Sequence, residues 1–291
     1  MSKATRIRQQ NARERIAAQR AAARRAEIRN RILIVTGSAL AVIAIVVVLV
    51  VVKATGNGSN QKQLSTEVLP ASVTSQIASV PASTLNSVGI GQILSYNPSP
   101  ISSISNTALK SNGKPEMLYI GAEFCPYCAA ERWAMAVALN RFGHFTTQLT
   151  GIHSSSTDTD PNTPTLTFYR AGYTSPYLVF TPVENETVNK TLLQTPTPAE
   201  QTLWNDYNAN SYPFIDFGNK YVIKAPSYDP ATLKGLTWAQ VAADLKNPSS
   251  TVAKNVDGAA NLITAAICKM TGGQPGSVCS SSGVVAASAH L

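Results

Sequence analysis

Charged side chains are scarce in this chain: they make up 14% of its 291 residues, against about 25% in a typical soluble domain. The formal net charge of +8 comes entirely from residues 1–31, which hold ten basic and two acidic side chains. Residues 32–291 hold 14 of each sign and have no excess of either. Because no positive surplus remains to meet a phosphate backbone, the sequence argues against nucleic-acid binding. The remainder is rich in Ser, Thr, Ala, Asn and Pro, which suits an exported surface better than a cytosolic one.

Charge is absent altogether from residues 32–52, ILIVTGSALAVIAIVVVLVVV. A helix of this length extends roughly 31 Å, which matches the hydrocarbon core of a bilayer. A signal peptide has a shorter apolar region and a small-residue cleavage site, and the following VVKATGNG offers no convincing A-x-A pattern. The sequence therefore predicts an uncleaved transmembrane helix; the alternative, a buried core helix, would need a protein shell that the flanks do not provide.

The flanks of this segment predict its orientation. The basic tail, residues 1–31, precedes it and only Lys53 follows closely, so the N-terminus is expected in the cytoplasm and the C-terminal part outside the cell membrane. The tail is also expected to contact anionic lipid. Residues 53–78 begin with the polar run KATGNGSNQKQLST and are assigned to a linker. Residues 79–291 are assigned to one extracytoplasmic domain.

The hydrophobic pattern of this domain predicts an α/β fold. The apolar run 117–121 is expected to be a buried strand, and the helix after it is expected to end at Gly143. The remaining predicted elements are strands within 145–156 and 163–183, a helix over 198–208, a hairpin over 211–223, and Ala-rich helices over 238–247 and 257–270. A strand–helix–strand order followed by a hairpin and closing helices indicates α/β or α+β.

Cysteine is rare as well, and the four cysteines form two unlike pairs. Cys125 and Cys128 form a C-x-x-C motif between the predicted strand and helix. Unpaired N–H groups and the helix dipole stabilise a thiolate at a helix N-terminus, and Pro126 suits the first helical turn. The motif therefore predicts a redox dithiol in which Cys125 is the exposed, attacking sulfur and Cys128 resolves the mixed disulfide.

Two other roles for this motif have less support. A zinc site would need a second C-x-x-C or a pair of histidines at ligand spacing, and His144 and His153 do not have that spacing. No metal or other cofactor is therefore predicted. An inert disulfide between Cys125 and Cys128 would constrain little of the unfolded chain.

The second pair, Cys268 and Cys279, encloses the loop KMTGGQPGSV. Closing such a Gly- and Pro-rich loop is typical of a structural disulfide. The alternative is a second redox pair that passes electrons to the first, but no helix N-terminus is in view to lower either pKa.

Three stretches carry a resemblance to a known family: GAEFCPYCAAERWAMAVALNRFG, SYPFIDFGNKYVI and NLITAAICKMTGGQPGSVC. They resemble the thioredoxin-like family described as domain of unknown function 929, which occurs in membrane-anchored proteins of actinobacteria and archaea. The resemblance covers about residues 79–280. It implies a thioredoxin-like fold with an insertion and a helical C-terminal extension. CPYC also occurs in glutaredoxins, but nothing here resembles their glutathione-binding features.

Thioredoxin-like folds place a cis-proline loop against the C-x-x-C motif, and Tyr212-Pro213 stands at the corresponding point before the hairpin. Pro213 is therefore predicted to join Cys125 and Cys128 in the site, although an ordinary proline at a strand start is the simpler alternative. Pro213 follows Cys128 by 85 positions, which implies an insertion that we expect to contain residues 184–208.

These features predict a membrane-tethered, extracytoplasmic thiol–disulfide oxidoreductase. Its partners would be exported client proteins that contain cysteine and a membrane protein that restores its redox state. The alternative is a redox-inert binding module with a thioredoxin fold and two structural disulfides. Glu123 and Glu131 flank the motif and are candidates for moving the proton of the resolving thiol, or else they simply favour the helix dipole.

Overall fold

A computed structural model of the chain describes residues 66–291. The predicted membrane anchor 32–52, the basic tail 1–31 and the first part of the linker lie outside these residues. Among residues 66–291, no helix is both long enough and apolar enough to cross a bilayer.

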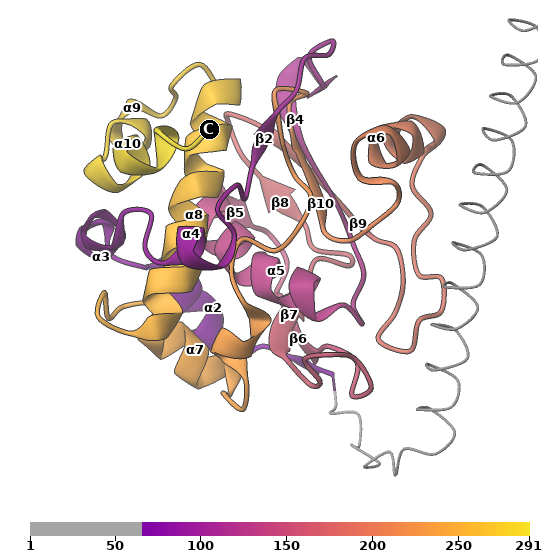
Figure 1. Cartoon of the computed structure of the whole chain (residues 1–291), viewed down its shortest axis with the longest axis vertical. Coiled ribbons are helices and arrows are strands. Elements are labelled where there is room, and N and C mark those ends of the chain that lie inside the picture. The colour runs from indigo at the N-terminus through magenta and orange to yellow at the C-terminus, as the bar shows by residue number, and fades with distance from the viewer. Residues whose placement is uncertain (1–65) are drawn as a thin grey trace, which may run out of the picture. The chain divides into compact units, whose positions relative to one another are not determined.

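The described residues form a mixed α/β structure around a central sheet (Figure 1). Strand β4 (Lys114–Gly121) is parallel to β9 (Val179–Glu184) on one side and antiparallel to β10 (Phe214–Phe217) on the other. β10 forms a hairpin with β11 (Tyr221–Ile223), β2 (Ser102–Ser103) pairs with β11, and β3 (Lys110–Ser111) pairs with the start of β4. β4 is therefore an interior strand of this sheet, next to the edge strand β9.

Alternation along β4 divides the core between the two faces of the sheet. Met117 and Tyr119 belong to the main core, which includes α5 (Pro126–Leu139) and α8 (Thr251–Met270). Leu118 and Ile120 pack instead with Trp204 of α6 (Pro198–Asn208). This is the period of two that a strand requires when both of its faces are buried. Helices α5 and α8 thus cover one face and α6 the other (Figure 1).

Among residues 66–291, six of the remaining helices pack against α8, and the seventh, α2, packs against α5 and α7. These seven helices are α2 (Ala71–Ala78), α3 (Ala82–Val88), α4 (Ile93–Tyr96), the short 3₁₀ helix η1 (Pro230–Leu233), α7 (Trp238–Asp244), α9 (Gly276–Cys279) and α10 (Ser282–Ser288). Residues 71–96 contribute α2, α3 and α4. The C-terminal region contributes the other helices of this group together with α8.

The start of the folded part differs from the sequence-based assignment, which places residues 53–78 in a linker. Strand β1 (Glu67–Val68) pairs with β6 (Thr150–His153), and Leu69, Val73 and Ile77 are at most 1% exposed. These three apolar residues recur every four positions and so form one buried stripe. Because Ser, Thr and Pro surround them in the sequence, the composition indicates a polar linker instead. The packed domain therefore begins before residue 79.

The extra residues between Cys128 and Pro213 are also distributed differently from the expectation. Residues 184–208 contain α6, which matches the helix predicted over 198–208. Most additional strands come earlier, between α5 and β9: β5 (His144–Phe145), β6 (Thr150–His153), β7 (Pro164–Thr167) and β8 (Tyr173–Thr174). They form the three-stranded sheet β1-β6-β7 and the two-stranded sheet β5-β8.

A disulfide joins Cys268 at the end of α8 to Cys279 at the end of α9, with 5.6 Å between their Cα atoms. We expect the Cys268→Ser/Cys279→Ser variant to lose about 2–4 kcal/mol of unfolding free energy, because the unfolded chain is no longer cross-linked. Thermal unfolding should show a midpoint several degrees lower. Thiol exchange at Cys125 should be unchanged. If the folded variant loses this exchange activity, Cys268 and Cys279 have a redox role instead of a structural one.

Candidate functional site

The dithiol lies at the point where strand β4 is followed by helix α5. β4 ends at Gly121, and Cys125 is the N-cap of α5 with an extended backbone. Pro126 occupies the first helical turn, where its missing N–H group costs nothing. The Sγ atom of Cys125 accepts the N–H of Cys128 at 3.4 Å. Both cysteines are free thiols. The first thiol therefore takes the position of a helix-capping group.

The surroundings separate the acidities of the two thiols. A hydrogen bond with the Cys128 side chain lowers the pKa of Cys125, and backbone N–H groups and the charge of Arg132 lower it further, against the opposing effect of burial. Burial raises the pKa of Cys128 well above its ordinary value, and the hydrogen bond and charge of Cys125 add to this effect. A negative charge on the pair is therefore held by Cys125, as its position at the helix N-terminus favours.

Access to Cys125 is more restricted than the sequence indicated. Cys125 is 5% exposed rather than open to solvent, and Cys128 is 0% exposed. The partly buried rings of Phe124, Tyr127 and Tyr212 pack around the two sulfurs. Two of these rings flank Cys125 in the sequence, but the third comes from the loop before β10. The order of accessibility is nonetheless the expected one, with Cys125 ahead of Cys128.

The loop before β10 lies next to the dithiol. The Tyr212–Pro213 peptide bond is cis, and Pro213 is buried. The Tyr212 hydroxyl donates to Asn185 Oδ1 at 2.5 Å and to Glu186 Oε1 at 3.0 Å. Its ring stacks on Trp204, with 5.1 Å between centroids. The segment after β9 and helix α6 thus hold this loop against the cysteines.

A buried ion pair, which the sequence analysis did not identify, lies behind the dithiol. Arg132 of α5 donates from Nε to Glu184 Oε1 at 2.8 Å and from Nη2 to Glu184 Oε2 at 2.6 Å. The same Nη2 donates to the carbonyl oxygen of Ala122 at 2.8 Å. Both charged side chains are 0% exposed. An arginine on an Ala-rich helix that was expected to pack in the core was the available signal, since a buried charge requires a partner.

The two candidate carboxylates form hydrogen bonds to groups other than the cysteines. Glu123 Oε1 accepts the hydroxyl of Thr167 at 2.8 Å, and burial raises the pKa of Glu123. Glu131 is 0% exposed and accepts the N–H of Ser227. Burial raises the pKa of Glu131 to about 7. Their positions in the fold thus connect them to β7 and to the loop before η1.

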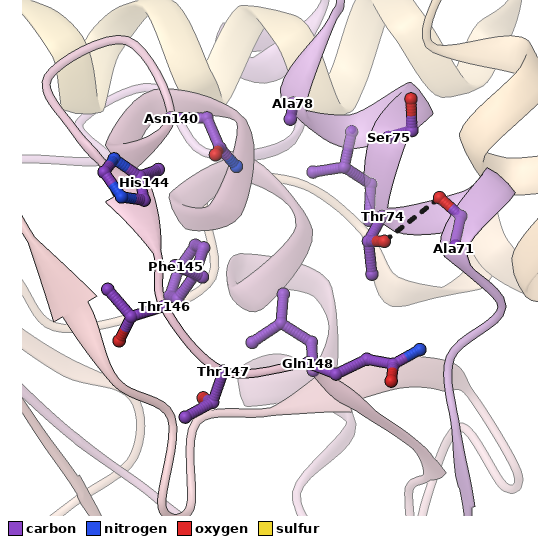
Figure 2. Close-up of a pocket in the computed structure, with 12 residues that line it drawn as sticks. Ala71, Thr74, Ser75, Ala78, Asn140, His144, Phe145, Thr146, Thr147 and Gln148 are labelled. Carbon is purple, nitrogen blue, oxygen red and sulfur yellow. Dashed lines mark hydrogen bonds between the residues drawn. The ribbon is translucent and has the colours of Figure 1, made fainter.

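A separate hollow of about 390 Å³ lies between α2 and residues 144–149 (Figure 2). Asn140 lines it from the far end of α5, roughly 20 Å along the helix from Cys125. Three of its polar side chains are engaged within the protein: Thr74 Oγ1 donates to Ala71, Asn140 Nδ2 to Ala136 and Gln148 Nε2 to Leu69. Among residues 66–291, moreover, no group of three or more His, Cys, Asp or Glu side chains could hold a metal ion.

Comparison with known proteins gives one match. Neither a curated protein nor a solved structure matches this chain significantly. A family model described as a domain of unknown function (DUF929) matches residues 100–269, more than half of the chain. The matched region contains Cys125, Cys128, Pro213 and Cys268, and it ends before Cys279. The chain therefore belongs to the DUF929 family.

Proposed function

We propose that this chain is a thiol–disulfide oxidoreductase of thioredoxin-like fold that acts on cysteines of exported proteins. One observation carries the proposal: Cys125 caps the N-terminus of α5, accepts an N–H group at its sulfur, and has a lowered pKa beside a second, fully buried thiol. A thiolate at such a position is the attacking group in disulfide exchange.

The strand order supports the thioredoxin-like part of the proposal. The strand before the C-x-x-C motif, β4, lies between the parallel strand β9 and the antiparallel hairpin β10-β11. Helix α5 follows the motif, and α8 follows the hairpin on the same face. The buried Pro213, at the start of the hairpin and next to Tyr212, agrees with the same arrangement.

The proposed exchange conserves electrons within the two sulfur pairs. In the oxidising direction, a client thiolate attacks Sγ of Cys125 in the Cys125–Cys128 disulfide. The client–Cys125 bond forms, the Cys125–Cys128 bond breaks, and the electron pair goes to Cys128. A second client thiolate then releases Cys125, which leaves a client disulfide and the protein dithiol. In the reducing direction the same steps run in reverse, and Cys128 displaces the client sulfur.

The partners of this reaction follow from the proposed location. The anchor at 32–52 and the basic tail at 1–31 would hold the domain at the outer face of the cell membrane, with the tail on anionic lipid. An extended client segment would lie along the main chain of Tyr212 beside Cys125. A membrane redox protein would restore the starting state of the dithiol.

One observation favours the alternative, a binding module without redox activity. The rings of Phe124, Tyr127 and Tyr212 leave Cys125 only 5% exposed. In a static module these rings would shield both sulfurs from any reagent or client. The two functions therefore differ in whether Cys125 reacts while the protein is folded.

The pH dependence of alkylation distinguishes them. We expect Cys125 of the folded protein to react with iodoacetamide with a midpoint below roughly 8.5, the value of a free cysteine, because the thiolate forms at a lower pH. Cys128 should react far more slowly, since it is 0% exposed. Mass spectrometry of the labelled peptides measures both rates. An ordinary thiol profile at Cys125, or no reaction before unfolding, favours the binding module.

A further inference from the structure

Two buried hydrogen-bond donors behind the dithiol have no oxygen or nitrogen acceptor among residues 66–291. They are the hydroxyl of Tyr119 and Nη1 of Arg132. Both side chains are 0% exposed. A buried donor without such an acceptor costs free energy, so each one calls for a structural or functional explanation.

Both donors lie next to the resolving cysteine. Arg132 follows Cys128 by four residues on α5, so the two side chains lie on the same helix face, and that of Arg132 leans back toward the helix N-terminus. Its guanidinium reaches the carbonyl of Ala122, which packs directly with Cys125 and Cys128. The ring of Tyr119 lies 5.9 Å from Arg132 Cζ.

The Cys128 sulfur also affects the acidity of the Tyr119 hydroxyl. Its charge contributes to raising the pKa of Tyr119, after the larger effect of burial. The tyrosine therefore keeps its proton and remains a donor when Cys128 is ionised. Arg132 favours the same ionised state, because its charge lowers the pKa of Cys128 against the effect of burial.

The backbone makes room for this hydroxyl. Gly121 lies two residues after Tyr119 on β4, so both face the same side of the sheet. A Cβ atom at position 121 would lie 2.0 Å from the Tyr119 hydroxyl oxygen. Any other residue would displace the ring from its place beside α5. The glycine thus permits the approach that brings the hydroxyl to the dithiol.

We propose that Tyr119 and Arg132 form a buried binding site for the thiolate of Cys128. The inference rests on the proposed exchange reaction. When a client thiolate attacks Cys125, the electron pair of the broken disulfide goes to Cys128, which must carry a negative charge where water is absent. The Tyr119 hydroxyl donates to this leaving sulfur, and the charge of Arg132 stabilises it. In the reverse step the same groups hold Cys128 as the thiolate that attacks the mixed disulfide.

The reaction of the reduced full chain with dithiobis(nitrobenzoate) tests this site. Cys125 attacks the reagent and releases one coloured thiolate; Cys128 then attacks the mixed disulfide and releases the second. In Tyr119→Phe we expect the first phase to be unchanged. The second phase should slow about tenfold at neutral pH, which is the lower end of the range that the loss of a hydrogen bond to a charged group produces. The pH midpoint of the second phase should rise by about one unit, since a tenfold change corresponds to one unit.

Two further variants separate this role from a structural one. Tyr228 is also 0% exposed, but its hydroxyl donates to the carbonyl of Ala130 at 2.6 Å. Tyr228→Phe should therefore leave both phases unchanged. Arg132→Met/Glu184→Gln removes the charge together with its partner and should also slow the second phase and raise its pH midpoint.

The outcomes distinguish this inference from the function on which it rests. If the first phase is normal and the second keeps its rate and pH midpoint in both Tyr119→Phe and Arg132→Met/Glu184→Gln, the thiolate site is refuted and the exchange reaction stands. Equal slowing in Tyr228→Phe would also refute it, because any loss of a buried hydroxyl would then suffice. If the wild-type protein shows no first phase, the proposed function fails and the inference fails with it.

Discussion

A Cys128→Ser variant should accumulate mixed disulfides with exported proteins, whereas a Cys125→Ser variant should accumulate none. In the first variant Cys125 still attacks a client disulfide from the N-terminus of α5, but the sulfur that would release the client is gone. In the second variant the remaining thiol is 0% exposed and cannot reach a client. We therefore expect nearly all of the trapped mixed disulfide to form in the Cys128→Ser variant and almost none in Cys125→Ser.

Non-reducing electrophoresis after acid quenching measures the trapped complexes in cells, and reduction should release them. Cys268→Ser/Cys279→Ser supplies the matched control, since it also removes cysteines but leaves the dithiol intact. It should trap no more than the wild-type protein. Equal trapping by Cys125→Ser and Cys128→Ser would contradict the assignment of Cys125 as the attacking sulfur.

The largest expected effect on stability concerns the ion pair behind the dithiol. Arg132→Met should cost about 3–5 kcal/mol of unfolding free energy, because it leaves the Glu184 carboxylate buried without its counter-charge. Arg132→Met/Glu184→Gln should recover most of that loss. The amide introduced by Glu184→Gln retains an oxygen for the Phe168 N–H, which Glu184 Oε1 accepts at 3.0 Å. The carbonyl of Ala122 likewise retains its hydrogen bond from the Cys125 N–H.

Urea unfolding of the single and double variants measures this coupling. The exposed pair Lys190–Asp158, 3.3 Å apart with the lysine side chain 49% exposed, provides a control. Lys190→Met should change the unfolding free energy by no more than about 1 kcal/mol. A double variant that is as unstable as the sum of its single changes would show that the two charges do not act as a pair.

The elements that the sequence predicted well have local signals. Helix α6 matches the predicted range 198–208, and its start is set by Thr197 and Glu200, which cap each other's backbone N–H groups. The hairpin β10-β11 turns at Gly218 and Asn219, both with positive φ. The helix predicted after the C-x-x-C motif begins inside the motif, at Pro126, and it ends at Leu139, before the expected stop at Gly143. Such elements depend on neighbours within a few residues.

The features that the sequence did not reveal depend on contacts between distant segments. Glu184 lies 52 positions after Arg132, and Tyr212 lies 84 positions after Cys128. The spacing of residues therefore could not show that Tyr212 covers Cys125 or that Arg132 has a buried partner. Similarly, the apolar stripe on α2 is short, and its burial depends on α5 and α7, which it contacts. The composition of residues 53–78 alone therefore placed the boundary too late.

The most direct test of the account is a redox titration of the dithiol in glutathione buffers of graded composition. The full chain carrying Cys268→Ser/Cys279→Ser leaves Cys125 and Cys128 as its cysteines, and acid quenching followed by alkylation counts the free thiols by mass. We expect one two-electron transition, in which both thiols disappear together and both return on reduction. If both thiols stay free across the whole range while the protein remains folded, or if glutathione adds to Cys125 without a Cys125–Cys128 disulfide forming, the dithiol is not an exchange site.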